Sequence, residues 1–200
     1  MSFFPPDPES PPFDDAPAMR SPWWTAPTDR LPVLYPASEI LVTTGHLAIA
    51  LAGVDVYADG AEIRIERRLR RNDAPLDEWQ RMNNVFMEHW AGHGQSSAGR
   101  LRYGVVLSTG EQVISDRAFG FAGDPMSPPK GSSLVRSGGG GGGDGHSYSS
   151  NDALWLWPLP PPGSLELVLQ WPALGVPETR TYLDVSSFGE LAERSVPFWP

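Results

Sequence analysis

The sequence contains no cysteine and only one lysine, Lys130. Without cysteine there is no disulfide framework, no thiolate metal site and no thiol nucleophile, which fits a reducing compartment, and we expect a cytoplasmic protein. No apolar run approaches the roughly 18 residues that a membrane-spanning helix needs. The N-terminal sequence MSFFPPDPES also lacks the basic and apolar regions of a secretory signal. The sequence therefore predicts no membrane association.

Positive charge is scarce as well. The chain has 15 Lys and Arg against 24 Asp and Glu, a formal net charge of −9, and this disfavours nucleic acid, whose phosphates are bound by clustered cations. Five arginines between positions 64 and 71 form the one basic cluster. Three of them, Arg64, Arg68 and Arg70, are predicted to share the exposed face of a strand. They could meet an acidic partner surface or the acidic N-terminal arm of the same chain.

Proline, glycine and tryptophan are abundant. The chain has 22 prolines, 21 glycines and eight tryptophans in 200 residues, which indicates one folded, β-rich domain with much irregular backbone. Residues 1–38 hold ten prolines, which block helix and central strand, and we expect an extended Pro-rich arm. The domain is then expected over residues 39–200. Its Gly-rich tract, residues 137–151, is predicted to be a flexible loop.

Alternation of apolar and polar residues predicts strands from Glu39 onward. The Asp59-Gly60 pair predicts a hairpin with a type I′ turn. After it, apolar and charged residues alternate from Ile63 to Arg70, and only Arg67 breaks the pattern. A second hairpin is expected over residues 101–115, with its turn near Thr109-Gly110.

Residues 153–171, ALWLWPLPPPGSLELVLQW, read as two apolar strands joined by a proline corner, and we expect a hairpin on which the core is built. Trp155 and Trp157 lie two apart and so share one face of their strand. Burial in the core explains them better than a partner contact does. Thr179, Thr181 and Leu183 then alternate with polar neighbours in a further strand.

Two helices are predicted. Apolar residues at three- and four-residue spacing favour an inserted helix over residues 76–90, laid across one sheet. A short C-terminal helix is expected with Ser186 or Ser187 as its cap, and Glu190 stands three residues after Ser187, at the spacing of a capping box. The fold class is thus mostly β, an antiparallel β-sandwich of the Ig-like or jelly-roll-like kind with an inserted helix, a short C-terminal helix and the Pro-rich arm.

Motifs for catalysis are weak. His89 and His93 are four apart, as zinc ligands on a helix can be, but no Glu follows His89 and the HExxH pattern fails. The glycine run lacks the Lys and Ser or Thr of a P-loop, and no GxSxG elbow is present. We therefore predict no catalytic residue, no cofactor and no metal. The alternative is a small hydrolase or metal-dependent enzyme with a site at the 89–93 and 138–148 loops.

Aromatic residues among prolines indicate a partner contact. Trp23 and Trp24 follow Pro22, and Phe198 and Trp199 lie between Pro197 and Pro200. Docking on the body of the same chain explains them equally well. The expected function is a non-catalytic protein-binding or assembly module of unknown pathway, with another protein as partner and oligomers possible. A further alternative is a structural subunit of a phage-like or secretion assembly.

One segment carries a resemblance. Residues 154–184, LWLWPLPPPGSLELVLQWPALGVPETRTYLD, are similar to the C-terminal part of a group of uncharacterised actinobacterial proteins. Those proteins share a Gly-rich loop, a WPLPPPG corner and a PETR segment, and Gln170 stands here where an acid is common. The resemblance implies a bacterial setting but no activity.

Overall fold

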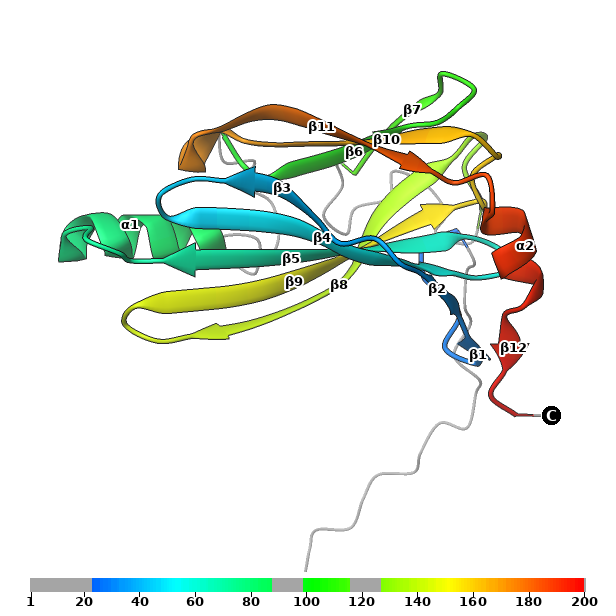
Figure 1. Ribbon diagram of the computed structural model, residues 1–200, viewed down its shortest axis with the longest axis horizontal. Coiled ribbons are helices and arrows are strands. Elements are labelled where there is room, and N and C mark those ends of the chain that lie inside the picture. Colours follow the sequence, from blue (N-terminus) through cyan, green and yellow to red (C-terminus); the bar gives the residue numbers. More distant parts are fainter. Residues whose placement is uncertain (1–22, 88–98, 116–126, 200) are drawn as a thin grey trace, which may run out of the picture.

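The computed structural model describes residues 23–87, 99–115 and 127–199, and most of these residues form β-strands. Two antiparallel sheets pack face to face with a helix at each end of the stack (Figure 1). The predicted class, an antiparallel β-sandwich with two helices, is confirmed.

The larger sheet has six strands. Five of them follow the order β2-β4-β5-β9-β8, and the sixth, β3, pairs with the first half of β4, whose second half pairs with β2. Every pairing in this sheet is antiparallel. The strands are β2 (Val33–Tyr35), β3 (Glu39–Thr43), β4 (Leu47–Val56), β5 (Ala61–Arg70), β8 (Ser133–Gly143) and β9 (Ser147–Trp157).

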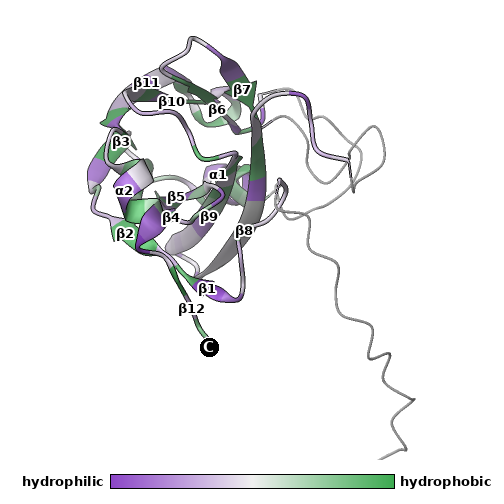
Figure 2. Cartoon of the chain, turned by 90° about the vertical axis from the view of Figure 1, so that its right-hand side faces the viewer, coloured by the Kyte–Doolittle hydropathy of each residue, from purple (hydrophilic) through white to green (hydrophobic). Residues whose placement is uncertain are grey.

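The smaller sheet has the strand order β11-β10-β6-β7. The strands are β6 (Arg102–Val106), β7 (Gln112–Ile114), β10 (Ser164–Trp171) and β11 (Val176–Asp184). Its two edges approach the larger sheet, β11 beside β3 and β7 beside β8 (Figure 2). A separate ribbon pairs β1 (Arg30–Leu31) with β12 (Val196–Pro197).

The core lies between the two sheets. Along β5, odd-numbered residues are buried and even-numbered residues are more exposed, as the sequence alternation predicts. Leu165, Leu167 and Leu169 of β10 face them from the smaller sheet and are almost fully buried. Each such side chain contributes about 1.5–3 kcal/mol of transfer free energy on burial.

The helices close the open ends of the sandwich. Helix α1 (Leu76–Met87) buries Trp79, Met82 and Phe86, as its periodicity predicts, but it lies at one end of the stack instead of across a sheet (Figure 1). The predicted residues 88–90 lie outside the described part. Helix α2 (Phe188–Glu193) closes the other end, with the Phe188 ring 5.2 Å from that of Tyr35. The Ser187 side chain makes no capping hydrogen bond, so the predicted capping box is wrong.

The hairpin expected at residues 153–171 is instead a connection between sheets. Strand β9 pairs with β5 and β8, whereas β10 pairs with β6 and β11. The proline corner between them therefore carries the chain from the larger sheet to the smaller one. Gly163 completes the corner at φ 122°, and a Cβ there would lie 2.9 Å from the Cβ of Ser108.

The predicted β4–β5 hairpin forms, but its turn differs from type I′. The Tyr57 N–H donates to the Gly60 carbonyl, which makes Ala58 and Asp59 the central residues, and neither has positive φ. Gly60 is needed for another reason, since a Cβ there would lie 2.5 Å from the Trp155 ring. The β6–β7 hairpin has its turn at Thr109-Gly110, as predicted.

Two further segments differ from expectation. The glycine run, expected as a loop, continues β8 as a regular strand paired residue by residue with β9. Residues 33–35, expected within the arm, form β2 and join the larger sheet. Residues 1–22 of the arm lie outside the described part of the chain.

Candidate protein-binding surface

The segments at the two ends of the described chain meet in one short ribbon. We call Asp29–Leu31 together with Val196–Trp199 the terminal ribbon. The Phe198 N–H donates to the Asp29 carbonyl at 2.9 Å, and the Ser195 hydroxyl donates to the Leu31 carbonyl at 3.0 Å. The Arg30 guanidinium donates to the carbonyl of Ser195. These bonds hold the ribbon in place where it projects from the body of the sandwich (Figure 1).

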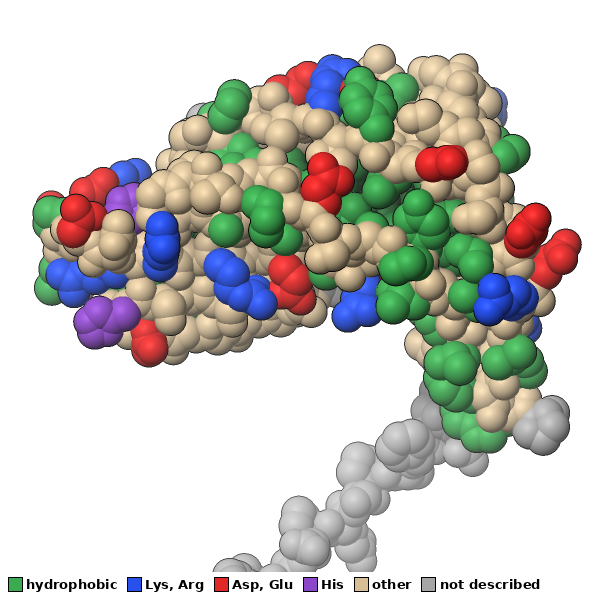
Figure 3. All heavy atoms as spheres, viewed as in Figure 1, with side chains coloured by type: hydrophobic (Ala, Val, Ile, Leu, Met, Phe, Trp, Pro, Cys, Tyr) green, Lys and Arg blue, Asp and Glu red, His purple; other side chains and the backbone are tan. Residues whose placement is uncertain are grey.

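The terminal ribbon presents apolar side chains to solvent. Leu31 is 49% exposed, Val196 50%, Phe198 54% and Trp199 70%. The rings of Phe198 and Trp199 lie 5.8 Å apart and are tilted by 54°. In the space-filling view these side chains form an apolar patch at the lower right (Figure 3). Isolated exposed apolar residues are ordinary, but a contiguous group indicates an interaction site.

Trp23 and Trp24 do not join that patch. Trp23 is only 5% exposed, and its carbonyl accepts a hydrogen bond from the Ser133 hydroxyl at 2.8 Å. The Trp24 ring lies 5.4 Å from the Trp23 ring and is half-buried. Burial removes Trp23 from the open surface, in line with docking on the body of the same chain.

Arg64, Arg68 and Arg70 lie on the exposed outer face of β5, as the alternation predicts. Each has a polar neighbour: the Arg64 guanidinium is 4.0 Å from the Asp55 carboxylate, and that of Arg68 is 2.7 Å from Glu66. The Arg70 Nε donates to the carbonyl of Gly45.

These local pairings limit what the arginine row can bind. Burial raises the pKa of Asp55, although the charge of Arg64 acts in the opposite direction. The three guanidinium groups are spread along one strand and each has its own neighbour. The row can add charge at the rim of an interface, but its cations do not converge on one anion.

Arg67 points the other way, into the core, where it has no solvent exposure. Its Nε lies 2.9 Å from Asp152 Oδ2. Its Nη2 donates to Asp152 Oδ1 at 3.0 Å and to the Ser150 hydroxyl at 2.9 Å. The Tyr103 hydroxyl donates to Asp152 Oδ2 at 2.6 Å, and Arg136 donates to Oδ1. Strands β5, β9, β6 and β8 thus contribute to one ionic cluster.

Aromatic rings close this cluster. The Arg67 guanidinium carbon lies 4.7 Å from the Phe86 ring centre and 5.4 Å from that of Trp171, both cation–π contacts. Phe86 and Trp171 stack at 5.7 Å, and Tyr148 meets Phe86 edge-on at 5.6 Å. Helix α1 is therefore attached to the sandwich through the charged cluster as well as through apolar packing.

The cluster sets the protonation of its members. Burial alone would raise the pKa of Asp152, but the charges of Arg67 and Arg136 and the hydrogen bonds outweigh burial and lower this pKa. Burial foremost, and then the charge of Asp152, raise the pKa of Tyr103 well above its usual value. Asp152 is thus a carboxylate and Tyr103 a neutral donor, which suits a permanent structural ion pair.

The sequence analysis did not predict this ionic cluster, although the positions of Arg67 and Asp152 in their strands indicate that both side chains point inward. Arg67 falls on the apolar face of β5 between Ile65 and Leu69. Asp152 falls on the inner face of β9, two residues before Leu154. A cation and an anion at inward positions of two strands indicate a buried pair if the strands are neighbours, and that adjacency is not visible in the sequence.

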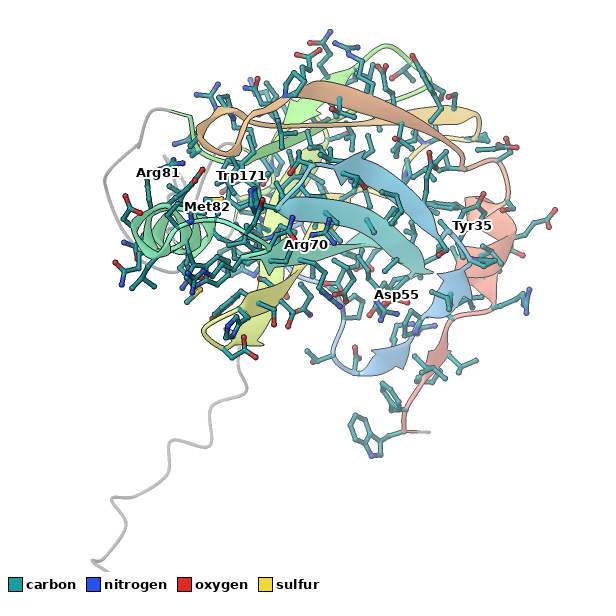
Figure 4. All side chains as sticks on the ribbon, turned by 60° about the vertical axis from the view of Figure 1, so that its left-hand side comes forward. Tyr35, Asp55, Arg70, Arg81, Met82 and Trp171 are labelled. Atoms are coloured by element: carbon teal, nitrogen blue, oxygen red, sulfur yellow. The ribbon has the colours of Figure 1, made fainter. Side chains whose placement is uncertain are left out.

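Two surface hollows accompany these features. One, of about 260 Å³, lies where Gly140–Gly142 leave the outer face of β8 without side chains, beside Glu66 and Arg68. The other, of about 360 Å³, lies between the β3–β4 turn and α1. Its rim includes His46, Glu78 and Arg81, and Figure 4 shows Arg81 on the outer side of α1 and Met82 on the side that faces the sheets.

Only one of the two segments of the alternative enzyme site lies in the described part of the chain. His89 and His93 lie outside the described part of the chain, and the 138–148 segment is the end of a strand and a tight turn. His46 Nδ1 lies 3.2 Å from the Arg70 carbonyl. Within residues 23–87, 99–115 and 127–199, no three His, Cys, Asp or Glu side chains gather as metal ligands would.

Neither helix in the described residues has the length and hydropathy that crossing a membrane requires. Four of the exposed large apolar side chains of the described residues, Leu31, Val196, Phe198 and Trp199, belong to the terminal ribbon. Comparison of the chain with protein-family models, curated proteins and solved structures finds no match.

Proposed function

We propose that the chain is a non-catalytic protein-binding module whose contact surface is the terminal ribbon. The observation that carries the proposal is the exposure of Phe198 (54%) and Trp199 (70%) at the end of a hydrogen-bonded ribbon. The partner is a protein with an apolar groove that receives both rings. Leu31 and Val196 would pack against the sides of that groove.

Energetics favour this surface as an anchor. Aromatic side chains bury 150–250 Å² each, and at about 25 cal/mol per Å² two such rings are worth several kcal/mol. Trp is also one of the residue types enriched among the few side chains that dominate binding energy. The hydrogen bonds of Ser195 and Phe198 order the ribbon before binding, and this lowers the entropy that association costs.

The burial of the ionic cluster around Arg67 and Asp152 supports a structural rather than a catalytic role for these charged residues. Arg67 and the Asp152 side chain have no solvent exposure, and Phe86 and Trp171 cover the guanidinium. A substrate could reach these groups only if the sandwich opened. Their arrangement instead provides a rigid body from which the terminal ribbon projects.

Site-specific photo-crosslinking tests the proposal. A benzophenone amino acid replaces Trp199 in the full chain, which is expressed in its native cells and irradiated. The matched control carries the same group at Tyr182, an aromatic residue of β11 that is 68% exposed. The proposal predicts one discrete protein adduct from position 199 that is missing from position 182. Identical adduct patterns from both positions would count against the terminal ribbon as the contact surface.

A further inference from the structure

The outer face of the larger sheet is hollowed beside β5. Ser149 of β9 pairs with Arg68 on one side and with Gly142 of β8 on the other, and Gly140 lies level with Glu66 in the same way. Paired residues point to the same face of a sheet, so β8 and β9 form a floor of short side chains beside the charged side chains of β5. The hollow of about 260 Å³ described above lies there. Figure 3 shows basic side chains spaced along this face.

The arginines beside the hollow keep donors for a further anion. Arg68 donates to Glu66 and to a backbone carbonyl through Nη1 alone, so its Nε and Nη2 bond to nothing among the described residues. Arg70 donates to a backbone carbonyl through Nε alone, which leaves both of its terminal nitrogens. The Arg64 side chain is 50% exposed, and its ion pair is long, at 4.0 Å. Each guanidinium can therefore receive another carboxylate.

The spacing of these arginines indicates the shape of the occupant. Arg64, Arg68 and Arg70 span six residues of one strand, which is about 20 Å at 3.3 Å per residue. A small anion can contact only one end of such a row. An extended segment that carries several carboxylates can contact all of it.

The chain itself contains such a segment. Residues 7–15 carry four acids and neither lysine nor arginine, and the acids are Asp7, Glu9, Asp14 and Asp15. They belong to residues 1–22, which lie outside the described part of the chain. The prolines among them favour the extended polyproline II conformation, and this lowers the entropy that docking costs.

The described chain begins on this same face. Leu134 of β8 is buried in the core, so its neighbour Ser133 points outward. The Ser133 hydroxyl donates to the Trp23 carbonyl at 2.8 Å, and Ser133 pairs with Trp157 of β9. Trp23 therefore attaches the preceding residues to the outer face at the Trp157 end of β9.

The distance from this attachment to the arginines matches the length of the arm. From Trp157 to Ser149, the residue level with Arg68, β9 runs eight residues, or about 26 Å. From Trp23 back to Asp15 is also eight residues, or about 25 Å in polyproline II. Exposed ion pairs are individually weak. A tethered segment has an effective concentration on the order of millimolar, which a separate acidic partner lacks.

We infer that residues 7–15 dock in extended form along the outer face of the larger sheet beside β5. Asp14 and Asp15 lie at Arg68 and Arg70, and the arm passes over the glycine floor of the hollow. An acidic partner protein then competes with the arm for the same arginines. This docking uses none of the residues of the terminal ribbon.

Because the chain has no cysteine, an introduced pair of cysteines reports the contact. The full chain carries Ala16→Cys in the arm and Ser149→Cys in the hollow, and the rate of disulfide formation within one chain is measured under mild oxidation. The same pair is combined with Arg68→Gln/Arg70→Gln. The matched control is Arg102→Gln/Arg194→Gln, which removes two exposed arginines elsewhere on the described surface and changes the net charge equally.

The disulfide is expected to form at least about threefold more slowly with Arg68→Gln/Arg70→Gln than with the control variant. Equal rates in the two variants would overturn the inference. A disulfide that joins two chains in place of one, seen as a dimer on a non-reducing gel, would also overturn it and would point to a second copy as the occupant.

Salt provides a second measurement. At about 1 M salt the Debye length is about 3 Å, so the rate with the native arginines should fall to that of Arg68→Gln/Arg70→Gln. A rate that does not change with salt would contradict docking by charge. Loss of the adduct at position 199 would leave all these results unchanged, so the two proposals can fail separately.

Discussion

The guanidinium of Arg67 and the carboxylate of Asp152 face each other across β5 and β9, with Arg67 Nε 2.9 Å from Asp152 Oδ2 and neither side chain exposed to solvent. This pair joins the two central strands of the larger sheet, and Tyr103 attaches β6 of the smaller sheet to it. The sandwich is thus connected through its centre by charge as well as by apolar packing.

Asp152→Asn is expected to destabilise the fold strongly. The variant keeps the shape of the side chain but leaves the Arg67 charge buried without its counter-ion, a change that costs about 3–5 kcal/mol. Urea unfolding measures the loss. Glu66→Gln is the control, because its pair with Arg68 is exposed and should contribute less than about 1 kcal/mol. Equal losses in the two variants would show that the buried pair has no special role.

The loss of unfolding free energy at acid pH should depend on Asp152. Its pKa in the fold is lowered, so its stabilising contribution is complete above the unfolded value near pH 3.9 and is lost as the pH falls through the lower folded value. Chemical unfolding between pH 2 and 6 should therefore show a steeper decline for the native sequence than for Asp152→Asn. Parallel curves would contradict this assignment.

The loss of unfolding free energy at alkaline pH should depend on Tyr103. Its pKa is raised in the fold, so the unfolded chain loses the phenolic proton first, near pH 10, and stability declines as the pH rises above that value. Tyr103→Phe removes this titration together with one hydrogen bond. The variant should be less stable at neutral pH but lose less of its stability between pH 9 and 11. A decline as steep as that of the native sequence would argue against a buried neutral Tyr103.

Gly60→Ala should reduce stability through a steric clash. The new Cβ would lie 2.5 Å from the Trp155 ring and 2.6 Å from the Leu156 carbonyl, and overpacking of this kind costs about 1–3 kcal/mol. Gly45→Ala is the matched control in the preceding turn, because a Cβ there meets nothing within 4 Å. Thermal unfolding of both variants gives the comparison. A stable Gly60→Ala protein would mean that Trp155 moves easily.

The two aromatic pairs that the sequence singles out should behave differently. Trp23→Ala removes a buried ring and should cost about 3 kcal/mol of unfolding free energy. Trp199→Ala removes a ring that is 70% exposed and should leave stability within about 0.5 kcal/mol of the native value. The same urea titration measures both. A large loss for Trp199→Ala would assign that ring to the fold instead of to a contact surface.

Local patterns predicted the strands well. The alternation in β5, the turn at Thr109-Gly110 and the buried face of α1 depend on neighbours in the sequence, and each is present. The corner after Trp157 was misassigned because apolar strands on both sides of a turn fit a hairpin and a crossover between sheets equally well. Only the partners of β9 and β10 distinguish the two.

The candidate surface was only partly visible in the sequence. Phe198 and Trp199 could be named from their proline neighbours, but their pairing with Asp29–Leu31 joins segments more than 160 residues apart. Trp23 has a similar local sequence and is buried, and its carbonyl accepts a hydrogen bond from Ser133, a residue 110 positions away. The glycine run was misread as a loop, since glycine favours flexibility until a neighbouring strand orders it.

The central claim is that Phe198 and Trp199 anchor a protein partner. Its most direct test is the affinity of the protein crosslinked at position 199 for the native chain and for the double variant Phe198→Ala/Trp199→Ala, measured by titration calorimetry. If the rings are anchors worth about 2 kcal/mol or more, affinity should fall by at least roughly 30-fold while the unfolding free energy stays unchanged. An unchanged affinity in the folded double variant would contradict the claim.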